Sequence, residues 1–90
     1  MLEKTIEAYL VKRIKDVGGV AYKFTSPQKR AVPDRLVLLP GGYAKFVELK
    51  APGKKASPAQ ERELEKLKAL GFEALVIDSK EAVDAWVKPI

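Results

Sequence analysis

The central part of the sequence holds two apolar runs separated by a turn, and this pattern constrains the fold more than any other feature. The first run, Leu36–Leu39, is apolar at every position, and the second, which ends in Phe46-Val47, lies within the returning segment 44–50. Between them, Pro40-Gly41-Gly42 is typical of a reverse turn, because glycine adopts positive φ without steric cost. We therefore predict a β-hairpin whose first strand is buried on both faces, in the interior of a sheet.

Three charged residues, Asp34, Glu48 and Lys50, lie within or beside this apolar hairpin. A charge in a buried strand lowers stability unless it is paired, hydrated or bound to a metal ion. Such a conflict between the local pattern and the side-chain type is expected at functional sites. Glu48 and Lys50 share one face of their strand, about 6–7 Å apart along it, because side chains alternate between faces. These residues are the first candidates for a functional site.

The length of the hairpin loop decides whether Asp34 meets Glu48. A three-residue loop places Asp34 opposite Glu48, and a five-residue loop places it opposite Lys50. A loop of two or four residues places it opposite Leu49, on the other face of the sheet unless a bulge intervenes. We predict an odd loop or a bulge, so that Asp34, Glu48 and Lys50 converge at one end of the hairpin.

The flanking sequence predicts further helices and strands, each recognised by its periodicity and its end signals. They are a helix over 3–17, a strand over 20–24, a helix over 58–70 with Ser57 as its N-cap, a strand over 72–77 and a last helix capped by Ser79. The strand–helix–strand portion predicts a right-handed parallel crossover, whereas the hairpin is antiparallel. The apolar run Ala74–Ile77 indicates an interior strand. Together these elements predict an α/β fold, with a mixed sheet flanked by helices.

The length of 90 residues predicts a single domain over 1–90. The chain has no cysteine and no histidine, which excludes disulfides, Cys/His zinc sites and histidine catalysis. Any metal ion is therefore held by oxygen, as magnesium, manganese and calcium are. No run approaches the roughly 20 apolar residues of a membrane span, and the N-terminus continues directly into an amphipathic pattern. We therefore expect a cytoplasmic protein.

The net charge of +5 has two interpretations, a lysine-rich surface or attraction to a polyanion such as nucleic acid. The position of the charges favours the second, because basic residues surround the acidic centre of the hairpin. Such residues would hold phosphates and position a nucleic acid without reading its sequence. The candidates for this role are Lys23, Lys29, Arg30, Arg35, Lys54 and Lys55.

Two converging carboxylates with a lysine nearby suit metal-assisted hydrolysis of a phosphodiester. Asp34 and Glu48 would bind Mg²⁺ or Mn²⁺, with the backbone carbonyl of Leu49 as a further ligand. The ion would polarise the phosphate and lower the pKa of the attacking water. Lys50 would neutralise the charge that develops on the phosphate and would orient or deprotonate the water.

Two polar residues on predicted helices have both a structural and a functional interpretation. Glu7 borders the apolar stripe of the first helix, where a glutamate usually hydrates the edge of the stripe. Gln60 occupies the N3 position of a capping box opened by Ser57, which explains its type fully. Its spacing to Leu64 and Leu67 nevertheless points it toward the sheet. Spacing alone favours the structural interpretation for both residues.

The residues of the hairpin also carry a resemblance to a known family. Pro33-Asp34 followed by Glu48-Leu49-Lys50 resembles the signature of PD-(D/E)xK nucleases, and the predicted element order resembles their restriction-endonuclease-like αβββαβ core. The wider segments 31–36, 46–53 and 57–60 are similar to the VRR-NUC branch, in its stand-alone viral and bacterial type. One departure is Ala31, where that branch is expected to have glycine.

The resemblance implies a metal-dependent endonuclease that acts on structured DNA, such as four-way (Holliday) junctions or flaps, in DNA repair, recombination or phage replication. It also implies a homodimer, within a bacterial or phage-infected cell. Glu7 is favoured over Glu3 as the first-helix glutamate and possible metal ligand, because it lies deeper in the helix. By motif position the implied catalytic residues are Glu7, Asp34, Glu48, Lys50 and Gln60.

Two other functions compete with this one. A non-catalytic nucleic-acid-binding module of the same fold would bind DNA with steep salt dependence and would not cleave it with any metal. The intact set of Asp34, Glu48 and Lys50 argues against it. An interaction subunit with merely surface charges would bind no DNA, and metal would not change its melting temperature.

Overall fold

The computed structural model describes residues 1–90 as three helices and a four-stranded sheet. The elements are α1 (Glu3–Asp16), β1 (Val20–Lys23), β2 (Arg35–Leu39), β3 (Tyr43–Leu49), α2 (Pro58–Ala69), β4 (Glu73–Ile77) and α3 (Lys80–Val87). This order confirms the predicted α/β fold, and the observed boundaries lie within one residue of the predicted ones. None of the helices is long and apolar enough to cross a membrane.

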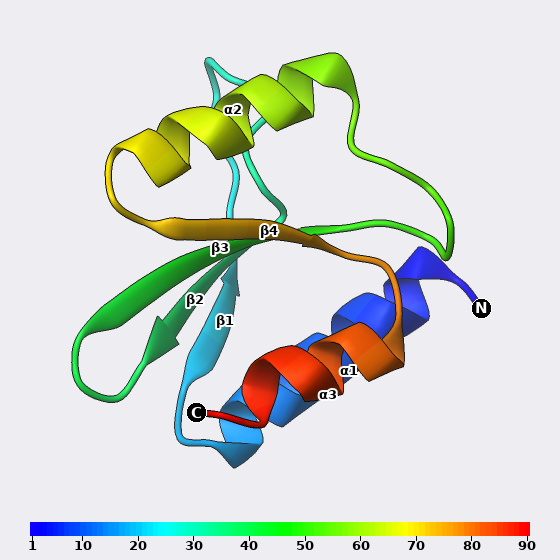
Figure 1. Ribbon diagram of the computed structural model, residues 1–90, viewed down its shortest axis with the longest axis vertical. Helices are drawn as coiled ribbons and strands as arrows, with labels where there is room; N and C mark the ends of the chain where they lie inside the picture. The colour runs from blue at the N-terminus through cyan, green and yellow to red at the C-terminus, as the bar shows by residue number, and fades with distance from the viewer.

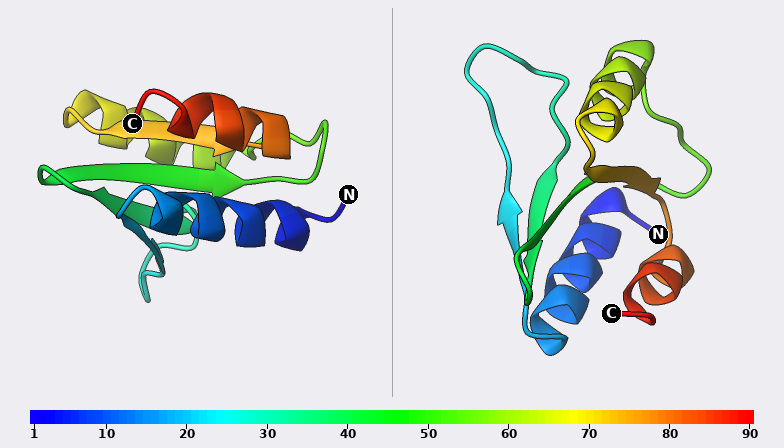
Figure 2. Two further views of the ribbon diagram at one scale, coloured as in Figure 1. Left: turned by 90° about the horizontal axis from the view of Figure 1, so that it is seen from below. Right: turned by 60° about the vertical axis from the view of Figure 1, so that its left-hand side comes forward.

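The helices cover the two faces of the sheet unequally. Figure 1 shows α2 above the sheet, and Figure 2 shows α1 and α3 side by side on the opposite face. On the α2 side, Phe46 of β3 and Ala74 of β4 pack against Leu64 of α2. Leu36 and Leu38 of β2 are therefore only half-buried, and the predicted burial of this strand on both faces is incomplete.

The sheet has the order β1-β2-β3-β4, with antiparallel pairing up to β3 and parallel pairing between β3 and β4. Leu39 pairs with Tyr43, so the hairpin loop has three residues, 40–42, with Gly41 and Gly42 at φ of 93° and 84°. The predicted odd loop length is therefore confirmed. The same register, continued one step past β2, sets Asp34 opposite Glu48.

The interior position predicted for the run 74–77 is wrong, because β4 pairs only with β3 and forms an edge of the sheet. Its apolar composition has another cause. Helices cover both faces of the sheet at this edge, so Ala74 is buried beneath α2 while Ile77 is buried in the opposite cluster. An apolar strand can thus lie at an edge when both of its faces are covered.

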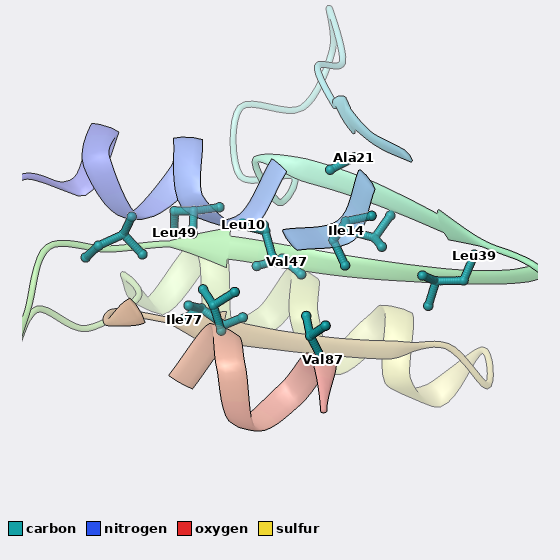
Figure 3. Packing of buried hydrophobic residues seen from close by; sticks show 11 residues of the cluster. Leu10, Ile14, Ala21, Leu39, Val47, Leu49, Ile77 and Val87 are labelled. Atoms are coloured by element: carbon teal, nitrogen blue, oxygen red, sulfur yellow. The ribbon is translucent and has the colours of Figure 1, made fainter. Parts of the chain in front are cut away.

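The main core lies between the sheet and the pair α1 and α3 (Figure 3). Ile6, Leu10 and Ile14 are fully buried there, which confirms the predicted stripe of α1. They pack with residues of the sheet that include Val47 and Leu49 of β3. This packing anchors α1 along the strand that carries Glu48.

Candidate active site

Asp34 lies immediately before β2, at the end of the sheet where β3 finishes. Its Oδ2 accepts a hydrogen bond from the backbone N–H of Leu49 at 2.8 Å. Its own carbonyl oxygen accepts a hydrogen bond from the backbone N–H of Phe24 at 2.9 Å. Side chain and backbone are therefore both held, and the carboxylate is fixed beside the end of β3.

Glu48 is almost fully buried, with 3% of its side chain exposed. Its Oε2 accepts a hydrogen bond from Nε2 of Gln60 at 3.0 Å and lies 3.7 Å from Nζ of Lys50. The pKa of Glu48 is raised to about 7, mainly by burial and in part by the charges of Asp34 and Glu3, while Lys50 opposes the shift. The pKa of a carboxyl group in this range is typical of a site that binds a cation or transfers a proton.

Gln60 serves both of the roles that its sequence position allows. Its side-chain Oε1 accepts a hydrogen bond from the backbone N–H of Ser57 at 2.9 Å. The backbone N–H of Gln60 donates to Ser57 Oγ at 3.2 Å, which completes the capping box. Because the amide oxygen is engaged by Ser57, the amide nitrogen is directed at Glu48. The start of α2 thus fixes the orientation of the buried carboxylate.

Replacing Gln60 with glutamate should separate these roles. Gln60→Glu keeps the capping-box acceptor, so the free energy of unfolding should change by less than about 1 kcal/mol at pH 5, where Glu48 is mostly protonated. At pH 8 the two carboxylates repel, and stability should fall measurably below that of the unchanged protein. Chemical denaturation at both pH values measures this. Equal losses at both would mean that Gln60 acts only as a cap.

Glu7, the predicted first-helix ligand, contacts Arg35 in the structure. Its Oε2 accepts a hydrogen bond from Nε of Arg35 at 2.8 Å, and Arg35 Nη1 donates to the carbonyl of Ala21 at 3.0 Å. The first-helix carboxylate whose charge acts on Glu48 is Glu3, one turn earlier.

The predicted basic residues fall into separate groups. Arg35 is engaged internally, with 18% of its side chain exposed. Lys54 and Lys55 are exposed in the loop between β3 and α2. Lys23, Lys29 and Arg30 line a shallow cavity of about 310 Å³ that also includes Asp34. Three of the predicted cations therefore border an acidic residue of the site, as the sequence indicated.

The oxygen donors at this end of the sheet fit a hard divalent cation. No group of three or more Asp, Glu, His or Cys side chains is arranged to hold a metal ion. Mg²⁺ commonly uses one or two carboxylates and completes its shell with water and substrate oxygens. Asp34 and Glu48 meet that requirement, and a cation would relieve the cost of the buried Glu48 charge.

Four long-range ion pairs were not predicted from the sequence, and two of them lie beside the site. Arg35–Glu7 joins residues 28 positions apart, and Lys29–Glu63 joins residues 34 positions apart with Nζ and Oε1 at 2.9 Å. Neither pair follows the three- or four-residue spacing that marks contacts within a helix. Only the packing of α1 against the sheet and of the 24–34 loop against α2 brings these partners together.

Comparisons with known proteins concern the fold and the sequence as a whole. A solved structure named "VRR_NUC domain" superposes with a TM-score of 0.90 at 32% identity, covering 96% of this chain and 94% of that one. A "VRR_NUC domain protein" shares the fold, with a TM-score of 0.74 at 19% identity over 98% of this chain and 86% of that one. No protein-family model matches the chain.

A protein named "Putative nuclease p44", from Acyrthosiphon pisum secondary endosymbiont phage 1, is 53% identical over 79 residues, covering 88% of this chain and 85% of that protein. These matches extend over most of each protein, so the likeness concerns the whole fold. The chain belongs to the VRR-NUC family, as the hairpin motif predicted.

Proposed function

We propose that this chain is a Mg²⁺- or Mn²⁺-dependent endonuclease that hydrolyses phosphodiester bonds in structured DNA, with four-way junctions or flaps as its substrates. The observation that carries the proposal is the geometry of Glu48: a buried carboxylate opposite Asp34, held by Gln60 and faced by Lys50. The name of the phage relative supports nuclease activity. We further propose that residues 1–90 form one nuclease domain, acting in DNA repair, recombination or phage replication in the cytoplasm of a bacterial or phage-infected cell.

Each residue of the site has a distinct task in this proposal. Asp34 and Glu48 hold the cation, together with the carbonyl of Leu49. Gln60 holds Glu48 in place through its amide nitrogen. Lys50 balances the charge that develops on the phosphate in the transition state. When bound, the metal ion supplies polarisation of the scissile phosphate and lowers the pKa of the attacking water.

We assign the first-helix ligand to Glu3 in place of Glu7. Glu3 is exposed, and its charge acts on Glu48, whereas Glu7 is engaged by Arg35. A carboxylate already paired with arginine is a poor metal ligand, because binding would require the ion pair to break. Glu7 then has a positioning task, since its contact with Arg35 ties α1 to the strand that begins after Asp34.

Two matched substitutions test this assignment. Glu3→Gln should weaken the rise in melting temperature produced by Mn²⁺, since it removes a ligand. Glu7→Gln should lower the free energy of unfolding by about 1 kcal/mol in the absence of metal, and should retain the Mn²⁺ effect. Thermal melts across a Mn²⁺ series compare the two variants. A Mn²⁺ effect lost in Glu7→Gln and kept in Glu3→Gln would reverse the assignment.

We also propose that the active form is a homodimer. One chain presents one site, whereas symmetric cutting of two strands at a junction requires two sites related by a two-fold axis. The remaining basic residues of the predicted set, in particular Lys23, Lys29 and Arg30 around Asp34, would hold the flanking phosphates on each half.

A cleavage panel tests the proposed function. The purified protein is incubated with four-way junction, flap, duplex and single-stranded DNA, with Mg²⁺, with Mn²⁺ and with a chelator. Nicking of a branched substrate that requires the metal supports the proposal, and light scattering of the same sample gives the oligomeric state. Binding with steep salt dependence and no cleavage under any metal would instead identify a non-catalytic module of the same fold.

A further inference from the structure

A second shallow cavity, of about 310 Å³, lies between the 24–34 loop and α2, and none of the proposed catalytic residues lines it. Its lining residues are Lys29, Ala31, Ala59, Arg62, Glu63 and Lys66. Lys29 also lines the cavity that contains Asp34, so the two cavities share a wall. Figure 1 and the right view of Figure 2 show the loop and α2 extending beyond the same edge of the sheet. We call the cavity between them the α2 groove.

The α2 groove carries a net positive charge, because its one acidic residue is neutralised by an ion pair within the groove. Arg62 and Lys66 are exposed and take part in none of the salt bridges of the chain. The only carboxylate of the groove, Glu63, is paired with Lys29 at 2.9 Å. Ala59, one turn before Glu63, leaves room beside the helix. The uncompensated charge of the groove is therefore positive.

Building on the proposed function, we propose that the α2 groove binds the sugar–phosphate backbone of a duplex DNA arm leaving the active site. The groove and the site share α2, since Gln60 at its start contacts Glu48. Arg62 and Lys66 lie about 6 Å apart along the helix axis, at 1.5 Å per residue. Phosphates follow one another closely along a strand of duplex DNA, at about one for every 3.4 Å of the duplex axis, so two cations at this spacing can contact neighbouring phosphates of one strand.

The side chains of the α2 groove favour a duplex over a single strand. Proteins that bind single strands stack bases on aromatic side chains. The α2 groove has no aromatic residue in its lining, and the adjoining cavity has only Phe24. Phe24 is half-buried and packs against Phe46 with ring centroids 5.7 Å apart, so its ring serves the core. Cations without stacking surfaces suit a backbone whose bases are already paired.

The test compares two double variants that each remove two positive charges. Arg62→Gln/Lys66→Gln removes the cations of the groove, and Lys15→Gln/Lys88→Gln removes two exposed cations outside it. Fluorescence anisotropy across a salt series, with a chelator present, gives the Kd for a four-way junction, a duplex and a single strand. The groove variant should bind the junction and the duplex roughly tenfold more weakly or worse, and its salt slope should fall by about 1.8, at 0.9 per phosphate contact.

The outcomes separate this inference from the proposed function. If the groove variant keeps the affinity and slope of the control variant, the α2 groove does not bind DNA, whatever the cleavage panel shows. If its loss is equal or larger on single-stranded DNA, the duplex assignment is wrong. The single substitutions Arg62→Gln and Lys66→Gln, each expected to lose about half of the slope, replace the double variant if its melting temperature shows misfolding.

Discussion

Glu48→Gln is expected to raise the free energy of unfolding by about 3 kcal/mol near pH 8 and to leave it almost unchanged near pH 4. The pKa of Glu48 in the folded protein is about 7, against 4.5 without the protein environment. Burial is the main cause, and the neighbouring Asp34 adds to it. Glutamine has the shape of the protonated glutamate and carries no charge to bury.

The sign follows from the direction of the pKa change. Glu48 has a raised pKa in the folded state, so folding favours its protonated form. The stability that it contributes is fully present below about pH 4.5, where both states are protonated, and is lost as the pH rises through about 7. Above that pH the folded protein holds a buried charge, and the glutamine variant avoids this cost.

Denaturant titrations from about pH 4 to 8 measure the difference between the two proteins. An increase of about 3 kcal/mol corresponds to a rise in melting temperature of roughly 10 °C or more for a domain of this size. Glu65→Gln is a suitable control, because Glu65 lies on α2 with 71% of its side chain exposed. If the free energies of unfolding of Glu48→Gln and the unchanged protein depend on pH in the same way, the buried charge of Glu48 does not lower stability. The variant should be inactive, because it lacks a carboxylate that we propose holds the metal ion. A gain in stability with a loss of activity is common where a functional site is held at a cost.

Lys50→Ala is expected to lower the rate of metal-dependent cleavage about 100- to 1,000-fold at saturating DNA. Lys50 Nζ lies 3.7 Å from the Glu48 carboxylate, where it would also face the phosphate of a bound strand. Removing it takes away a positive charge that the transition state needs more than the ground state does. The effect should therefore fall on kcat and should leave KM much less affected.

Lys50→Ala should also change the pKa of Glu48. Lys50 opposes the rise in the pKa of Glu48, so removing it should move the pH-dependent loss of stability to higher pH. Lys15→Ala, an exposed lysine on α1, should change neither the rate nor this pH dependence. Cleavage by a folded Lys50→Ala at an unchanged rate would contradict the proposed mechanism.

The hairpin could be predicted because all of its determinants are local. The two glycines at 41–42 accept the positive φ that a three-residue loop requires, and that length alone brings Asp34 opposite Glu48. The capping box at Ser57 is equally local, and it carries Gln60 to the site. Alternation along β3 then puts Glu48 and Lys50 on the same face.

Residues whose partners lie far along the chain could not be assigned in the same way. Glu3 and Glu7 stand one turn apart on one helix, and helical periodicity treats them alike. Which of them meets Arg35 depends on the position of α1 along the sheet. The packing of Ile6 and Leu10 against the sheet sets that position. Arg35 is similar: its motif position suggested DNA, whereas Glu7 and the Ala21 carbonyl engage it.

The sequence by itself determined the element order, the register of the hairpin and the convergence of Asp34, Glu48 and Lys50 at one end of it. These follow from backbone preferences and strand alternation, which act over a few residues. The tertiary structure alone decided that β4 is an edge strand, that Glu7 binds Arg35, and that Arg62 and Lys66 line a groove beside the site. Each depends on how helices and loops dock onto the sheet, which non-local packing controls.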